Sequence, residues 1–214
     1  MLRLRLVCSL ILLVPAAACR TGPSKGALEP APPVVAEAVE PWREVASPRD
    51  SVLIEEIEGR WERALAAGRA AGSSRRIAAE GDLLAPGAGL ERAAPAPGPY
   101  RCRYVRPGGR RWAASPEGYC YVGVEAGQLS LATELRGLRV GGYLWERKDG
   151  GRLVFLGASV PPGARTPPAY GVMPVRDSAG IFERIGDFRY RLVLPEPSPG
   201  APFTIVEMVA APQE

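Results

Sequence analysis

A β-hairpin is encoded by the sequence LRVGGYLWERKDGGRLVFLGA, residues 138–158. Both flanks are rich in Val, Leu, Tyr, Trp and Phe, which fit a pleated, half-buried surface. Between the flanks lies Asp149-Gly150, a dipeptide favoured in type I′ turns because both central residues of that turn need φ > 0. The pattern therefore predicts two antiparallel strands joined by a tight turn.

The rest of the chain from residue 99 to residue 211 repeats this pattern, with turn residues between short alternating segments. The other expected strands are Tyr100–Val105, Tyr119–Val124, Leu129–Thr133, an edge strand at Gly171–Arg176, Ile181–Ile185, Phe188–Leu194 and Phe203–Val209. Seven or eight short strands spaced by about ten residues are typical of an antiparallel barrel or sandwich.

Residues 42–86 show helical periodicity instead. The segment Ser47-Pro48-Arg49-Asp50 has the signature of a helix start: a capping residue, a proline suited to the first position, and an acid three residues after the cap. Apolar residues then recur at steps of three and four as far as about Ala71, with Trp61 on the stripe that we expect to be core. A second, shorter helix is expected over residues 73–84.

Together these patterns predict one α+β domain, residues 42–214. Its N-terminal helices, in residues 42–86, are expected to pack on the outside or across one end of a mainly antiparallel β-barrel or sandwich formed by residues 99–211. A closed barrel would remove the exposed edge strands that a chain this rich in β-formers has to avoid.

The first 41 residues read as an export signal followed by a tether. Residues 1–18 combine a short basic segment with an apolar stretch that is too short to span a bilayer and ends in small residues before Cys19. This resembles a bacterial lipoprotein signal, in which Cys19 receives the lipid; an ordinary secretory signal cut near Ala18 is the alternative. Residues 19–41 are rich in Pro and Ala and predict an extended tether. We therefore expect a protein held in the membrane of the bacterial envelope by lipid on Cys19, facing the periplasm, at the outer membrane rather than the inner one.

Charge and the missing histidines exclude several functions. Without Arg3 and Arg5 of the signal, the net charge falls from +4 to +2, which argues against a nucleic-acid partner. A chain with no His can hold neither a Ser-His-Asp set nor a His-based zinc site. We expect no metal and no other cofactor.

Two cysteines remain for the folded domain once Cys8 leaves with the signal and Cys19 carries lipid. Cys102 and Cys120 are expected to form a disulfide, because an even pair in an exported protein is oxidised by default. A redox-active pair is the alternative, and it is disfavoured because the spacing is not Cys-x-x-Cys.

Several sequence blocks follow one another in a distinctive order. They are Trp42-Arg43, Asp50 and Trp61 in the helical part, and YRCR (100–103), RLVFLG (152–157), ERIG (183–186), RLVLP (191–195) and IVEM (205–208) in the β part. In these blocks and their order, the chain resembles a bacterial family catalogued as domain of unknown function 4893. The resemblance implies an exported envelope protein; it transfers no activity and identifies no functional residues.

Aromatic residues of the β part are the candidate contacts for a ligand or partner: Tyr104, Tyr121, Tyr143, Trp145 and Trp112. Several alternate along strands and could line the mouth of a barrel, whereas the more ordinary role for such residues is to fill the core. The carboxylates show no spacing that singles out a catalytic pair, and Glu183 is expected on a solvated strand face. We therefore predict no catalytic residue.

Three functions remain open. The preferred one is a non-catalytic binding or accessory role, in which barrel loops dock or inhibit another envelope protein. The second is a carrier of a small apolar ligand inside the barrel, and the third is a His-free hydrolase with two converging carboxylates. A packed interior with an exposed apolar patch on the loops would favour docking, whereas a cavity lined by Tyr143, Phe155 and Phe188 would favour the carrier.

Overall fold

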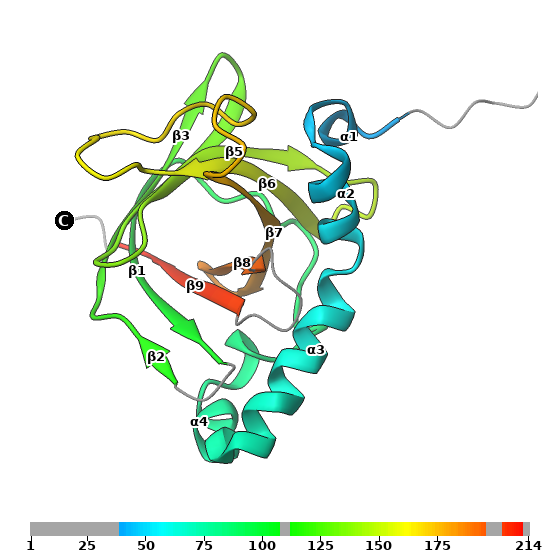
Figure 1. Cartoon of the computed structure of the whole chain (residues 1–214), viewed down its shortest axis with the longest axis vertical. Helices are drawn as coiled ribbons and strands as arrows, with labels where there is room; N and C mark the ends of the chain where they lie inside the picture. The colour runs from blue at the N-terminus through cyan, green and yellow to red at the C-terminus, as the bar shows by residue number, and fades with distance from the viewer. Residues whose placement is uncertain (1–38, 108–111, 196–202, 212–214) are drawn as a thin grey trace, which may run out of the picture. The chain divides into compact units, whose positions relative to one another are not determined.

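The computed structural model describes residues 39–107, 112–195 and 203–211. Within these residues, nine antiparallel strands form one sheet, and eight of them close into a barrel (Figure 1). The strands are β1 (Gly98–Arg106), β2 (Ala113–Ala114), β3 (Gly118–Glu125), β4 (Gln128–Glu134), β5 (Val140–Glu146), β6 (Arg152–Ser159), β7 (Asp177–Gly186), β8 (Arg189–Pro195) and β9 (Phe203–Ala210). The order is β1-β3-β4-β5-β6-β7-β8-β9, with β9 pairing back to β1 and β2 added to the end of β1. The α+β prediction is confirmed, and the β part is a barrel.

Side chains alternate between the barrel interior and its outer surface. On β6, Leu153 and Phe155 belong to the interior cluster, whereas Val154 and Leu156 belong to a second cluster outside the barrel. Interior side chains that are almost completely buried are Leu131, Leu144, Phe155, Phe182, Leu192, Val206 and Met208. An eight-stranded barrel is just wide enough inside for side chains to fill, and these residues fill it.

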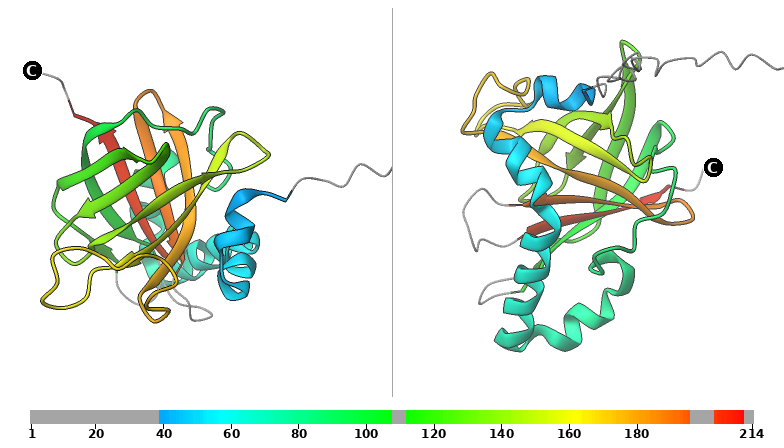
Figure 2. Two further views of the ribbon diagram at one scale, coloured as in Figure 1. Left: turned by 90° about the horizontal axis from the view of Figure 1, so that it is seen from above. Right: turned by 90° about the vertical axis from the view of Figure 1, so that its right-hand side faces the viewer.

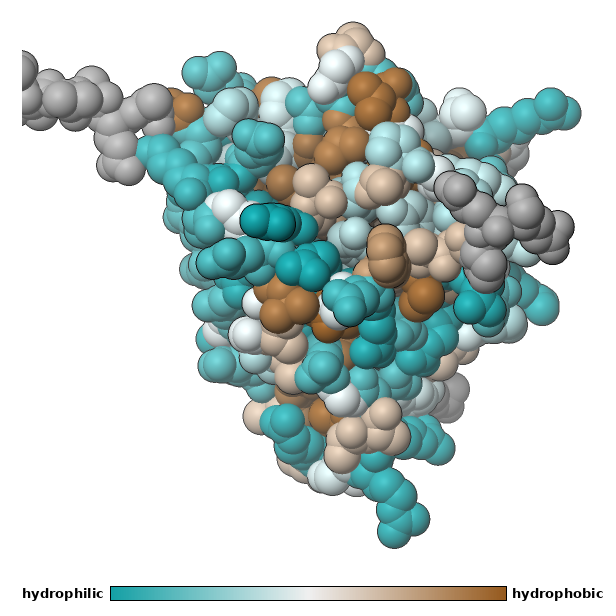
Figure 3. All heavy atoms as spheres, turned by 180° about the vertical axis from the view of Figure 1, so that it is seen from behind, coloured by the Kyte–Doolittle hydropathy of each residue, from teal (hydrophilic) through white to brown (hydrophobic). Residues whose placement is uncertain are grey.

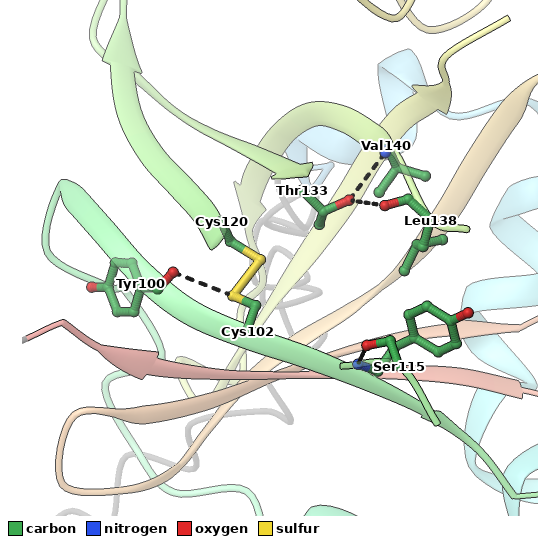
Figure 4. Close-up of a disulfide and its surroundings, with 8 residues drawn as sticks. Tyr100, Cys102, Ser115, Cys120, Thr133, Leu138 and Val140 are labelled. Carbon is green, nitrogen blue, oxygen red and sulfur yellow. Dashed lines mark hydrogen bonds between the residues drawn. A yellow bond between two sulfur atoms is a disulfide. The ribbon is translucent and has the colours of Figure 1, made fainter. Parts of the chain in front are cut away.

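The predicted disulfide is confirmed. Cys102 and Cys120 are bonded inside the barrel and join β1 to β3 (Figure 4). In the same region the hydroxyl of Thr133 donates to the carbonyl of Leu138 and accepts from the N–H of Val140, both at 3.1 Å. The disulfide therefore joins β1 to β3, and the Thr133 hydroxyl joins β4 to the start of β5.

The helical part is more interrupted than the periodicity predicts. Its elements are α1 (Pro41–Val45), α2 (Pro48–Glu55), α3 (Ile57–Gly68), a π-helical segment (Arg69–Ser73), α4 (Ser74–Ala79) and a 3₁₀ turn (Gly81–Leu83). The single helix expected as far as Ala71 breaks at Glu56, where ψ is 0°, and is distorted at Gly72, where φ is +86°. The break at Glu56 lets α2 pack on β7 while α3 packs on β8. The short α1, which begins at the last residue of the expected tether, was not predicted.

The helices cover one side of the barrel, over the outer faces of β6 to β9 (Figure 2). The residues that meet in this second cluster include Trp42, Ile54, Ile57, Trp61 and Leu65 from the helices and Val154, Ile181, Val193 and Ile205 from the strands. Strands β6 to β9 are thus largely buried on both faces. Trp61 is a core residue, as expected.

The predicted type I′ turn at Asp149-Gly150 is wrong, although β5 and β6 do pair as an antiparallel hairpin. Residues Arg147–Gly151 join β5 to β6 as a longer loop, and the positive φ falls on Gly150 without Asp149. The pair of positive φ angles that a type I′ turn needs occurs instead at Ala126-Gly127, with 49° and 85°.

No strand forms at Gly171–Arg176, where an edge strand was expected. The segment is a run of turns, in which the N–H of Arg176 donates to the carbonyl of Met173 at 2.7 Å. This bond closes within the segment, and Pro174 lacks the N–H that a ladder partner would need.

Candidate functional site

A cleft of about 570 Å³ lies on the outer face of β3, β4 and β5, beside the loop that joins β6 to β7. The small residues along its floor are Gly123, Ser130, Ala132 and Gly141. Tyr121 lies opposite Ala132, and Tyr143 lies opposite Ser130, so the two tyrosines face outward from the strands on either side of β4. Small floor residues allow a ligand to approach the strand backbone closely, and the tyrosines offer flat apolar faces beside it.

The other wall of the cleft is the segment Thr166–Tyr170 of the β6–β7 loop. Figure 1 shows this loop, in yellow, crossing over β3 and β5. Pro167 lies so close to Gly141 that a Cβ at Gly141 would be 2.9 Å from the Cγ of Pro167. The glycine therefore sets how closely the loop approaches β5.

Hydrogen bonds hold this loop at several points. The guanidinium of Arg139 donates to the carbonyls of Ala164 and Arg165, at 3.4 and 2.6 Å. The hydroxyl of Tyr170 donates to the Asp50 carboxylate at 2.5 Å and accepts from the N–H of Ser47 at 2.9 Å. Burial and the nearby Asp50 carboxylate raise the pKa of Tyr170, so the hydroxyl keeps the proton that it donates. The wall is therefore positioned before any ligand arrives.

The start of α2 is capped differently from the sequence prediction. The N–H of Asp50 donates to the hydroxyl of Ser47 at 3.1 Å, as expected for an N-cap. The carboxylate of Asp50, however, accepts from Tyr170, and the backbone N–H of Ser47 donates to the same tyrosine. Tyr170 thus replaces the second half of the predicted capping box and links the cleft wall to the helices.

Few polar groups line the cleft. The hydroxyl of Tyr143 donates to Glu125 at 2.9 Å, and this hydrogen bond raises the pKa of Tyr143. Ser130 and Thr166 contribute hydroxyls. Glu125 is the one carboxylate among the described residues of the lining, whereas glycoside hydrolysis uses a pair. The arrangement suits binding by apolar contact and a few directed hydrogen bonds.

The candidate residues from the sequence separate into three groups. Tyr121 and Tyr143 meet at the cleft. Tyr104 lies in the packed barrel interior, and Trp112 and Trp145 pack against the helix-covered cluster. Cys19 lies outside the described residues. No sequence pattern points to the Thr166–Tyr170 wall, because the segment resembles an ordinary turn-rich loop and only its return onto β5 makes it part of a site.

A buried ionic network lies between the barrel and the helices. Arg191 on β8 and Glu183 on β7 are both 0% exposed, and their Nε and Oε2 atoms are 2.6 Å apart. The other oxygen of Glu183 accepts from Arg152 at 2.8 Å, and Arg152 also pairs with Glu58 on α3. The expectation that Glu183 lies on a solvated strand face is therefore wrong, because the helices cover that face.

Arg191 also contacts the helical part directly. Its guanidinium lies 4.4 Å from the centre of the Trp61 ring and donates to the carbonyls of Asp82, Leu83 and Ala85. Burial lowers the pKa of Arg191, while the Glu183 carboxylate opposes that shift. The network therefore fastens the helices to β6, β7 and β8, and its two central charges have no access to a ligand.

The described part of the chain contains no group of three or more acidic or cysteine side chains placed to hold a metal ion. None of its helices is both long and apolar enough to cross a bilayer.

A known protein family matches most of the chain. Neither a curated protein nor a solved structure matches the chain. A family model described as a domain of unknown function (DUF4893) matches residues 42–208, which run from α1 into β9. The match covers the helices, the barrel and every residue of the cleft, so the chain belongs to the DUF4893 family.

Proposed function

We propose that this protein is a lipid-anchored, non-catalytic docking module of the bacterial envelope. The cleft on β3, β4 and β5, beside the β6–β7 loop, would receive an extended segment of another envelope protein. The observation that carries this proposal is the preformed cleft itself, with a floor of small residues, tyrosines on two strands, and a wall fixed by Tyr170. Extended peptides bind in such grooves through backbone contacts and aromatic side walls.

The packed barrel interior favours docking over the carrier. Phe155 is buried among other interior side chains, Tyr143 faces outward, and Phe188 is 71% exposed on the β7–β8 turn. These three residues therefore do not surround one common cavity, which the carrier hypothesis requires. A partner that binds at the cleft would meet its residues without unpacking the barrel.

Export and anchoring are proposed from the N-terminal sequence. Residues 1–18 carry the signal pattern, Cys19 is the lipid acceptor, and residues 19–41 supply the tether. The disulfide between Cys102 and Cys120 agrees with an oxidising compartment. A tethered module of this kind can reach partners at the membrane or in the periplasm.

Photo-crosslinking tests the proposal with a matched control on one strand. Tyr119 and Tyr121 both face outward from β3 and are 55% and 46% exposed, but only Tyr121 lines the cleft. A photoreactive phenylalanine analogue at position 121 should give a protein adduct in the envelope, whereas the same analogue at position 119 should not. The adduct should map to one short segment of one protein.

Two outcomes would contradict docking. Equal crosslinking from both positions would mean that contact is non-specific. No adduct from position 121, together with a bound mass of a few hundred daltons on native mass spectrometry, would support the carrier instead.

A further inference from the structure

The part of the β6–β7 loop that leads into β7 exposes three apolar side chains. Val172, Met173 and Val175 are 68%, 40% and 86% exposed. They lie in two consecutive turns, closed by hydrogen bonds from the N–H of Val172 to the carbonyl of Ala169 and from the N–H of Arg176 to the carbonyl of Met173. We call Val172–Val175 the loop tip.

The exposure of the loop tip is built into the fold. Immediately before the tip, Tyr170 is held by Asp50 and Ser47, and the N–H of Gly171 donates to the Asp177 carboxylate at 3.1 Å. Immediately after the tip, the carbonyl of Arg176 accepts from the N–H of Ser159 at 2.8 Å. With both ends fixed in this way, the apolar side chains cannot fold back onto the barrel without breaking these bonds.

Arginines outnumber carboxylates on the surface next to the loop tip. Arg165 is exposed on the same loop, and Arg49 and Arg176 line a hollow of about 210 Å³ together with Val175. Two carboxylates line the same hollow, those of Asp50 and Asp177, and their donors, the Tyr170 hydroxyl and the N–H of Gly171, are neutral. Three guanidinium groups against two carboxylates give this surface a small positive excess, which favours an anionic partner.

The apolar area of the loop tip is too small for a stable protein interface and favours contact with a membrane. A stable protein interface buries about 800 Å² on each side, far more than three side chains on a projecting loop supply. A few apolar side chains flanked by basic ones can instead enter the boundary between lipid headgroups and acyl chains. We propose that the loop tip is a membrane-contact site that inserts into a bilayer containing anionic phospholipid.

A lipid on Cys19 would be compatible with membrane contact by the loop tip. Val39 precedes Ser47 by eight residues, so the start of the described chain lies within about 30 Å of the backbone that Tyr170 binds. The tether upstream would not restrain the tip from the same membrane. This inference does not depend on what the cleft binds.

Vesicle flotation tests the proposal without the lipid anchor. The protein is the mature chain, residues 19–214, carrying Cys19→Ser, and the probe is vesicles of equal parts phosphatidylcholine and phosphatidylglycerol. The double variant Val172→Ser/Val175→Ser should reduce the bound fraction roughly tenfold, because it removes the apolar contact without changing the charge. Vesicles of phosphatidylcholine alone should bind the unsubstituted tip more weakly.

Phe188→Ser is the matched control. Phe188 is 71% exposed but lies on the β7–β8 turn, which antiparallel topology places at the opposite end of the barrel from the β6–β7 loop. It should float like the unsubstituted chain, and all variants should unfold at the same urea concentration because the altered side chains are exposed. No vesicle binding by the unsubstituted chain, or equal loss in the control, would overturn the proposal and leave the tip as a protein contact.

Discussion

Arg191 holds a positive charge where no solvent reaches it, and its surroundings explain how. The Glu183 carboxylate, three backbone carbonyls and the face of Trp61 replace part of the water that it lost on folding, while its Nη2 has no hydrogen-bond partner among the described residues. Removing one partner of such a pair leaves the other charge buried, which costs much more than losing a surface pair. The blocks that carry the family resemblance contain Trp61, Arg152, Glu183 and Arg191, which all belong to this network.

We predict that Arg191→Met lowers the free energy of unfolding by about 3–5 kcal/mol, as is typical when a buried ion pair is broken. Urea unfolding followed by circular dichroism measures the change. Arg101→Met is the control, because Arg101 and Glu117 are 51% and 58% exposed, and such pairs contribute about 0–1 kcal/mol. Similar losses in the two variants would show that the buried network does not fasten the helices.

Tyr100 makes the free energy of unfolding depend on pH in the alkaline range. Burial, and then the neighbouring Tyr190, raise the pKa of Tyr100 from 10.0 to about 12. The folded state therefore binds the phenolic proton more tightly than the unfolded chain does. This contribution to stability is complete below pH ~10 and is lost as the pH rises toward ~12, by about 3 kcal/mol in all.

Tyr100→Phe should remove that dependence. At neutral pH the variant should be about 1 kcal/mol less stable than the wild type, because the hydrogen bond from the Tyr100 hydroxyl to the Ala96 carbonyl is lost. Above pH ~10 the difference should shrink, since only the wild type still has this proton to lose. Urea unfolding from pH ~8 to pH ~11 tests this, and a constant difference between the two chains would contradict it.

At the scale of the elements, the close contact between β5 and the β6–β7 loop depends on the absence of a side chain at Gly141. In Gly141→Ala, the new Cβ would meet Pro167 at 2.9 Å, and neither the ring nor the strand can move easily. We predict that the loop shifts outward and that trypsin cleaves after the exposed Arg165 several-fold faster, since loosened loop tips are preferred cleavage sites. Limited proteolysis followed by mass spectrometry gives the rate.

Gly123→Ala is the control for that experiment. Its Cβ would meet only the hydroxyl of Ser130, which can rotate away. Cleavage after Arg165 should therefore stay at the wild-type rate in this variant. An unchanged rate in Gly141→Ala as well would mean that Pro167 does not hold the loop against β5.

The strands were easier to predict from the sequence than the helices and the cleft. Alternation and turn glycines are local signals, and they located most of the strands. The break at Glu56 depends on which strands α2 and α3 meet, and the burial of Glu183 depends on the helices that cover β7. Such facts arise from tertiary packing, which overrides local propensity.

The same limit applies to the candidate site. Tyr121 and Tyr143 could be nominated because aromatic residues alternate on strands, but Tyr104 follows the same pattern and points inward. Which face is inside depends on the closure of β9 onto β1, a pairing between residues about a hundred positions apart. The Pro167 contact at Gly141 likewise joins segments that no local pattern connects.

At the scale of the whole molecule, the two sides of the barrel differ: one is covered by the helices and the other carries the cleft. Helices cover the outer faces of β6 to β9 and fasten there through Arg191, whereas the faces of β3, β4 and β5 carry the cleft. Because side chains fill the barrel interior, the proposed docking uses the outer surface. The face seen from behind in Figure 3 is mostly hydrophilic with small, separated apolar areas, as expected of a surface that faces water.

The proposed anchor makes the final prediction. Cys19→Ser should move the protein from the membrane fraction to the soluble periplasm, because the loop tip alone lacks the affinity that a covalent lipid supplies. Cys8→Ser is the control: Cys8 lies in the proposed signal peptide, which would be cleaved off before Cys19, so this variant should fractionate like the wild type. If Cys19→Ser stays with the membrane and is released only by adding Val172→Ser/Val175→Ser, the loop tip is the principal membrane contact. If neither change releases it, both the lipid on Cys19 and the membrane role of the tip are contradicted.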